Sequence, residues 1–364
     1  VTRLPDTADR LAGRWRPSIA GVRGIAILAV LGFHAGLPIV SGGVVGVTLF
    51  FVLSGYLIAT LLLGEQEATG TVHVSRFYVR RAWRLLPALV TVTIGLMVLG
   101  VAAQDLHQVA EDSLLTLTYV ANWARSGGDE MGMWNHAWSL SIEGQFYVVA
   151  PIALLGVTRV ARSGSKRLIG ILVLALIVST FLRVAMTAAG ASAERVYFGT
   201  DTRMDALLLG CLVAGVRMWD PSWSPSRWVG PLSVLALGVL AFLPVADAIP
   251  VGLGYSLTAL ASCGVVAAAL REDPWWSRRP GRTLAWLGER SYALYLVHVP
   301  VFLFATHALA AAQPGVRVGT AVLASVTLSA LLFRYVERPS RRGTRISASA
   351  LRGSARSTFA PLHG

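Results

Sequence analysis

The chain has little charge and almost no cysteine. Of its 364 residues, 14% are charged and 54% are hydrophobic. This composition excludes an ordinary soluble domain and indicates an integral membrane protein. The two cysteines, Cys211 and Cys263, are too few for a disulfide framework or a cysteine-based metal cluster. We expect both to be small core residues.

Several short catalytic motifs are also absent. The chain contains no G-x-x-x-x-G-K-[ST] phosphate loop, no G-x-S-x-G nucleophile elbow and no H-E-x-x-H zinc motif. Their absence argues against a P-loop nucleotidase, an α/β-hydrolase and a zinc protease. We predict no metal site and no permanently bound cofactor.

Long apolar segments are what the chain does have. We count about ten that could cross a bilayer, whose hydrocarbon core is about 30 Å thick. The predicted spans are residues 21–40, 43–63, 85–102, 135–157, 168–187, 203–218, 229–246, 252–270, 291–311 and 316–336. The predicted fold class is therefore all-α integral membrane, with one membrane domain at 21–338 and no soluble domain.

The basic residues are distributed unevenly along these spans. The chain has 32 Lys and Arg against 19 Asp and Glu, a net charge of +13. Most of the basic residues lie in segments that an even number of spans puts on one side, which is the positive-inside pattern. We therefore predict cytoplasmic termini, with a basic lead-in at 1–20 and a basic flexible tail at 339–364. The excess charge reflects topology, not a nucleic-acid site.

One segment, residues 111–134, has an apolar core too short to span. If it spanned, every later basic loop would move to the wrong side. We therefore predict a half-helix or an interfacial hairpin on the outer face.

The first span carries an arginine and a histidine, Arg23 and His34. Eleven residues return to within about 20° of the starting face of a helix and rise about 16 Å. One helix face would therefore carry a cation near the cytoplasmic mouth and an imidazole near mid-membrane. Ionisable groups inside a span suggest function by default.

A run of arginines precedes the third span, RFYVRRAWRLLP. Arg76, Arg80 and Arg84 follow an i, i+4, i+8 spacing on one helical face, with Arg81 beside them, and Pro87 would lie in the first turn of the next span. The planar guanidinium pairs bidentately with phosphate oxygens, so this helix could bind a phosphorylated donor. Anchoring against lipid headgroups is the alternative.

The segment HAWSLSIEGQFYVVAP, residues 136–151, is unusually polar for the entry to a span. Trp138, Ser141 and Gln145 share one face and Glu143 lies on another. Aromatic residues are common at a membrane interface, but Glu143 at membrane depth needs a partner or an aqueous cavity. Its candidate partners are His34 and an acceptor hydroxyl.

Two later segments add candidate residues for which a purely structural role is the alternative. Arg203 and Asp205 lie at the head of a span, where Arg203 could simply pair with a neighbouring aspartate. His298 lies on a helix with Tyr292 and Tyr295, where it could be a hydrogen-bonded core residue.

These blocks together resemble acyltransferase family 3, the multi-span bacterial membrane acyltransferases that O-acylate glycans, lipid-linked sugars and macrolides. The resemblance covers about residues 16–340. It rests on Arg23-x10-His34, FFVLSGYLIATLL at 50–62, FYVRRAWRLLPAL at 77–89, the NW…WSLSIEGQFYVVAP block, RMDALLLG and SYALYLVHVP. Gly144 departs from the family, which often has a second Glu there.

The resemblance implies an O-acyltransferase of the bacterial inner membrane that moves an acyl group, expected to be acetyl, from acyl-CoA to a hydroxyl of a glycan-like acceptor. Acyl-CoA would be a co-substrate. Arg23, Arg80, Arg81 and Arg84 would bind its phosphates. A buried, neutral His34 would be the general base or an acyl relay, and Glu143 would orient it or bind the acceptor. The supporting residues would be Trp138, Ser141, Gln145, Tyr56, Arg203, Asp205 and His298.

Three alternatives stay open at this point. In a transporter or flippase of a lipid-linked sugar, His34 and Glu143 would form a proton relay. A non-catalytic partner of a polysaccharide assembly complex would tolerate replacement of His34. A tailoring enzyme would acylate a small cytoplasmic acceptor such as a macrolide. The oligomeric state is open in each case.

Overall fold

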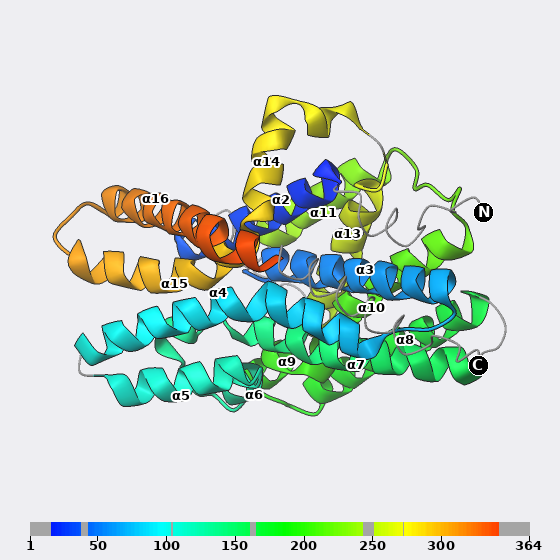
Figure 1. The fold of residues 1–364 in the computed structure, drawn as a ribbon, viewed down its shortest axis with the longest axis horizontal. Coiled ribbons are helices and arrows are strands. Elements are labelled where there is room, and N and C mark those ends of the chain that lie inside the picture. The colour runs from blue at the N-terminus through cyan, green and yellow to red at the C-terminus, as the bar shows by residue number, and fades with distance from the viewer. Residues whose placement is uncertain are drawn as a thin grey trace, which may run out of the picture.

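The computed structural model describes residues 16–37, 43–102, 105–160, 165–242, 251–271 and 273–341. Over these residues the fold is all-helical, without strands (Figure 1). The elements are α2 (Pro17–His34), α3 (Val44–Thr69), α4 (Val74–Ala102), α5 (Leu106–Leu117), α6 (Ala121–Ser126), η2 (Gly132–Trp134), α7 (Trp138–Val160), α8 (Ser165–Ala188), α9 (Ala193–Phe198), α10 (Thr200–Trp219), α11 (Val229–Phe242), α13 (Val251–Ala268), η3 (Pro274–Ser277), α14 (Arg279–Glu289), α15 (Ser291–Ala308), α16 (Pro314–Leu332) and η4 (Phe333–Glu337).

Seven helices in the described part of the chain are long and apolar enough to cross a bilayer: α2, α3, α4, α7, α8, α15 and α16. The other three predicted spans are also helical, as α10, α11 and α13. They are shorter or more polar. The described part of α11 has 14 residues, about 21 Å of helix at 1.5 Å per residue. The all-helical class is confirmed, and the count of ten spans stays a prediction.

The helices differ in how deeply they are buried. The apolar window of α3 is 72% buried and that of α8 only 11%, so α3 lies at the centre of the bundle and α8 at its edge. Large apolar side chains cover the outside, including Phe181 at 71% exposure and Leu323 at 68%. Soluble monomers rarely expose such continuous apolar surface, which supports a lipid-facing exterior.

The segment at 111–134 does not span. It forms the 12-residue helix α5, the six-residue helix α6 and the short turn η2. In Figure 1, α5 lies alongside the far end of α4, and the chain then returns toward the centre of the bundle. None of these elements is long enough to cross a bilayer, and the prediction of a half-helix or an interfacial hairpin on the outer face stays a prediction.

The arginine run is not a separate helix, which corrects our expectation. α4 runs unbroken from Val74 to Ala102, with Pro87 inside it instead of in a first turn. Proline removes one backbone hydrogen bond, but neighbouring helices and local adjustment let membrane helices continue through it. Arg81 and Arg84 are therefore held rigidly by the same helix that forms the span.

A close helix crossing sets the geometry around Arg23. A side chain on Gly24 would overlap the carbonyl of Leu284 in α14, and one on Gly288 would overlap the carbonyl of Ala20. The two glycines let α14 pack directly on α2. Because α15 starts at Ser291, immediately after α14, this crossing brings Ser291 next to Arg23.

The predicted lead-in and tail lie mostly outside the described residues. The first described residue is Arg16, and the description ends at Arg341. The three-part division at residues 20 and 338 stays a prediction.

Candidate active site

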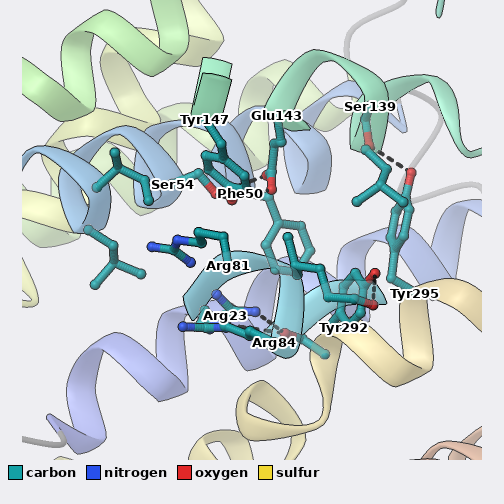
Figure 2. A pocket seen from close by; sticks show the side chains of 15 residues that line it. Arg23, Phe50, Ser54, Arg81, Arg84, Ser139, Glu143, Tyr147, Tyr292 and Tyr295 are labelled. Atoms are coloured by element: carbon teal, nitrogen blue, oxygen red, sulfur yellow. Dashed lines mark hydrogen bonds between the residues drawn. The ribbon is translucent and has the colours of Figure 1, made fainter. Parts of the chain in front are cut away.

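A pocket lies between α2, α3, α4, α7 and α15. We call it the arginine pocket. Figure 2 shows charged and hydroxyl side chains gathered around it. Its lining residues are Arg23, Phe50, Ser54, Leu57, Ile58, Arg81, Arg84, Leu85, Ser139, Leu140, Glu143, Tyr147, Ser291, Tyr292 and Tyr295.

Three of the four arginines expected to bind a donor line this pocket: Arg23, Arg81 and Arg84 (Figure 2). Arg23 is held in place by α14 and α15. Its Nη2 donates to Oγ of Ser291 at 2.8 Å, and its Nε donates to the carbonyl of Gly288 at 3.3 Å. The pocket lining thus carries three guanidinium groups and one carboxylate, that of Glu143.

Arg80 does not line the pocket, which corrects its expected grouping with the other three. Its Nη2 lies 3.6 Å from Oε2 of Glu65. Glu65 is 7% exposed, and its Oε1 also lies 4.0 Å from Arg76 and 3.7 Å from His73. Helical spacing placed Arg76 and Arg80 on one face, but it could not reveal a buried carboxylate opposite that face.

Glu143 is the acidic group of the pocket. Its Oε1 accepts a hydrogen bond from Ser54 at 2.9 Å, and its Oε2 accepts one from Tyr147 at 2.8 Å. The guanidinium of Arg81 lies 5.0 Å from the centre of the Tyr147 ring, a cation–π distance. Glu143 therefore fixes Tyr147, and through it the position of Arg81.

His34 has different neighbours from those we expected. Its ring lies 4.8 Å from that of His298, and its Nδ1 lies 2.9 Å from the carbonyl of Val30. Glu143 makes its hydrogen bonds to Ser54 and Tyr147 instead. The expected orientation of His34 by Glu143 is therefore not seen. The two groups face different parts of the site because Glu143 turns into the arginine pocket.

Arg23 and His34 do share a face of α2, as their spacing indicates. Both contact α15, Arg23 through Ser291 and His34 through His298. The 11-residue separation corresponds to about 16 Å along the helix axis. A charged site and an imidazole are thus presented along a single interface between α2 and α15.

Four expected supporting residues lie outside the pocket lining. Trp138 packs against the rings of Phe51 and two residues of α9, and Ser141 donates back to the carbonyl of Ala137. Gln145 bonds to Tyr119, Asn122 and Thr200. Tyr56 is buried in the main core. The four residues pack around the site, and their expected supporting role stays a prediction.

The pair at the head of α10 is also arranged differently. Arg203 is 1% exposed and does not bind Asp205. It donates to Thr48 at 2.8 Å, and its guanidinium lies 4.5 Å from the ring centre of Tyr255. Asp205 instead pairs with Arg183 at 2.8 Å. Arg183 lies in an apolar stretch of α8, and nothing in the sequence indicated which residue would pair with it.

Several residues of the site were missed as candidates. Ser54 and Ser291 are small polar residues inside quoted blocks, and nothing in their spacing marks them. Ser139 and Tyr295 lie 2.7 Å apart, oxygen to oxygen, and the Tyr295 hydroxyl donates to the carbonyl of His136. Since that proton is used, Ser139 donates to Tyr295. Each hydroxyl acquires its role only from contacts between distant helices.

Gly144, where the resembling family often has Glu, has a local explanation. A side chain at Gly144 would overlap the ring of Tyr119. Tyr119 has a positive φ of 58°, and its carbonyl accepts a hydrogen bond from Gln145 at 2.8 Å. In this chain the ring of Tyr119 takes the space of the second carboxylate.

The fold and the pocket together define an all-helical protein of multi-pass membrane type with a cationic internal site. The model of the family described as "Acyltransferase domain" matches residues 16–334. The chain belongs to this family.

Named relatives agree with this assignment. The peptidoglycan O-acetyltransferase OatA of Listeria monocytogenes is 32% identical over 361 residues, covering 92% of this chain and 57% of that protein. A putative O-acetyltransferase of Staphylococcus aureus is 32% identical, covering 90% of this chain and 58% of that protein. The O-acetyltransferase OatA of S. aureus is 28% identical with the same coverage. The chain thus spans somewhat over half the length of these relatives. No solved structure matches it significantly.

Proposed function

We propose that this chain transfers an acetyl group from acetyl-CoA to a hydroxyl of a carbohydrate acceptor. The observation that carries the proposal is the charge of the arginine pocket, where three guanidinium groups face one carboxylate. Buried charge of one sign is costly unless a counter-charge joins it. A donor that carries several phosphates would provide this counter-charge.

Arg23, Arg81 and Arg84 are the proposed phosphate-binding residues. Guanidinium groups pair with phosphate oxygens through two parallel N–H donors. Arg23 and Arg81 are already oriented by Ser291 and Tyr147, so little further ordering is needed on binding. Arg80, paired with Glu65, has at most an outer role.

The interface between α2 and α15 is the proposed path for the donor arm. Phosphates bound near Arg23 would leave a long, uncharged arm to extend along α2 toward His34, about 16 Å away. The thioester would then lie near the His34 imidazole. This arrangement separates the charged end of the donor from its reactive end.

His34 is the proposed general base. It takes the proton from the acceptor hydroxyl as the oxygen forms a bond to the thioester carbon. The carbon–sulfur bond then breaks, and the proton passes to the leaving thiolate. The products are an ester and free CoA thiol. Glu143 acts in the donor site, through Tyr147 and Arg81.

The acceptor class and the membrane setting follow from the relatives and the charge pattern. The named relatives are bacterial O-acetyltransferases, one of them named for peptidoglycan. We infer a glycan acceptor, a bacterial inner-membrane location, about ten spans and cytoplasmic termini. Under this topology the arginine pocket lies in the cytoplasmic half of the bundle, where acetyl-CoA is available.

The proposal is tested with purified protein in nanodiscs and radiolabelled acetyl-CoA, comparing wild type with His34→Ala. Donor binding and slow thioester hydrolysis are followed without acceptor. Both proteins should bind, and only wild type should turn over. Binding by neither protein would overturn the donor assignment and favour the transporter reading. Full turnover by His34→Ala would overturn the base.

A further inference from the structure

A cluster of three imidazoles lies next to the arginine pocket. The ring of His298 lies 4.8 Å from that of His34 and 4.9 Å from that of His136. The three come from α2, from the turn before α7 and from α15. His136 is 5% exposed and His298 is fully buried. The packing of the helices therefore shields both of these rings from solvent.

The helices fix the tautomers of two of these rings. Nδ1 of His34 lies 2.9 Å from the carbonyl of Val30, and Nδ1 of His298 lies 2.7 Å from the carbonyl of Tyr295. A carbonyl oxygen only accepts, so each Nδ1 carries the hydrogen and each neutral ring keeps its lone pair on Nε2. Nε2 of His34 is thus the basic nitrogen.

The lone pair of His298 is not used elsewhere in the described part of the chain. Its Nε2 is buried and makes no hydrogen bond there. Buried polar atoms are normally hydrogen-bonded, and an exception calls for an explanation. His298 contacts aromatic rings and backbone carbonyls. Its Nε2 lone pair can therefore stabilise a proton that binds to His34.

The cluster is connected to the pocket by Tyr295. This residue lines the arginine pocket, its carbonyl holds His298, and its hydroxyl holds the backbone of His136. Its ring centre lies 5.5 Å from that of His298. The position of His298 is therefore tied to the wall of the proposed donor site.

We propose that His298 is the positioning residue of His34. The inference rests on the proposed function. When the acceptor O–H bond breaks, the proton binds Nε2 of His34, and the neighbouring neutral ring of His298, with its unused lone pair, stabilises the positive charge that the His34 ring acquires. The proton stays on Nε2 of His34 until the thiolate leaves and takes it up as the S–H of CoA. His136 packs behind His298 and keeps its ring in place.

The test compares His298→Phe, which keeps a flat ring but loses the lone pair, with His298→Gln, which offers an acceptor oxygen. The probe is acetyl-CoA in nanodiscs, with binding and turnover measured separately. We expect His298→Phe to lower turnover at least about tenfold, less than the roughly 10²–10⁴-fold effect of an acid–base group itself, with unchanged acetyl-CoA affinity. His298→Gln should recover most of the loss.

His307→Phe is the matched control. His307 lies on the same helix and has the same kind of contact, Nδ1 to the carbonyl of Leu303 at 2.8 Å, but it is exposed. Its replacement should leave turnover unchanged. An equal loss in His307→Phe and His298→Phe would show a general effect on α15 and overturn the inference.

The comparison of the Phe and Gln variants separates positioning from packing. Recovery by Gln and not by Phe shows that the acceptor atom beside His34 matters, because neither variant restores the imidazole ring itself. Equal losses of turnover in the two variants, both still binding acetyl-CoA, would overturn the inference. Should wild type itself fail to bind acetyl-CoA, the proposed function falls first and takes this inference with it.

Discussion

Fully buried Arg183 and the half-buried arginines of the arginine pocket differ in how their charge is balanced. Arg183 is fully buried, and its donors are all directed at the protein. Nε donates to the carbonyl of Gly252, Nη1 to that of Thr202, and Nη2 to Asp205 and Ser256. The arginine pocket instead has three guanidinium groups and one carboxylate in its lining.

The difference separates a structural ion pair from the proposed binding site. Around Arg183, the charge and its hydrogen bonds are completed within α8, α10 and α13, so no ligand is needed. Around Arg23, Arg81 and Arg84, the pocket lining holds three guanidinium groups and one carboxylate. This difference in sign is the basis of the proposed anionic donor.

The largest expected effect on stability comes from removing the counter-ion of Arg183. Asp205→Asn leaves the Arg183 guanidinium buried without its counter-ion, which should cost about 3–5 kcal/mol of stability. The measurement is thermal unfolding of the detergent-solubilised protein. The double replacement Arg183→Met with Asp205→Leu should recover most of the loss, because no unpaired charge remains. An unchanged melting temperature for Asp205→Asn would contradict the structural role.

Removing positive charge from the arginine pocket should weaken acetyl-CoA binding and leave folding unaffected. Arg81→Gln combined with Arg84→Gln removes two charged donors, each worth about 1.5–3 kcal/mol in a charge-assisted hydrogen bond. We expect KM for acetyl-CoA to rise by at least about tenfold per arginine, with a smaller change in kcat and unchanged thermal stability. Arg80→Gln is the neighbouring control, because Arg80 faces Glu65, and it should change KM little. A loss confined to kcat would contradict phosphate binding.

The smallest effect should come from an ion pair near the surface. Arg195 and Asp201 lie 2.6 Å apart, with side chains 27% and 32% exposed, and exposed pairs contribute about 0–1 kcal/mol. Burial alone would raise the pKa of Asp201, but hydrogen bonds and charge from Arg195 outweigh it and hold that pKa below its ordinary value.

A lowered carboxyl pKa stabilises the folded state above the unfolded pKa, about 3.9, and this stabilisation is lost as pH falls through the folded value. Asp201→Asn should therefore lower the melting temperature slightly at pH 7, and the difference should disappear at low pH. Paired melting curves at the two pH values measure this. A large effect at pH 7 would place this pair with Arg183 and Asp205.

The helical architecture and the shared helix face of Arg23 and His34 were predictable from the sequence. Apolar length predicted each of the main helices, because a bilayer requires long apolar segments. The spacing of Arg23 and His34 predicted their common face, and both residues do contact α15. The sequence also identified Arg81, Arg84 and Glu143 as candidate site residues, and all three line the arginine pocket.

Partners between helices were not predictable in the same way. Glu143 was expected beside His34 but binds Ser54 and Tyr147. Arg80 was expected in the donor site but faces Glu65. In each case the helix face was foreseen, but the residue opposite it was not, since a helical period says nothing about which neighbouring helix packs there.

The sequence by itself determined the all-helical class, the acyltransferase family and the shared face of Arg23 and His34, because these depend on local hydrophobicity, residue order and helix geometry. Only the tertiary structure decided which arginines enter the pocket, which carboxylates they meet and which ring lies beside His34. These choices arise where helices far apart in sequence pack at contact distance, and the burial of charge there depends on all of them together.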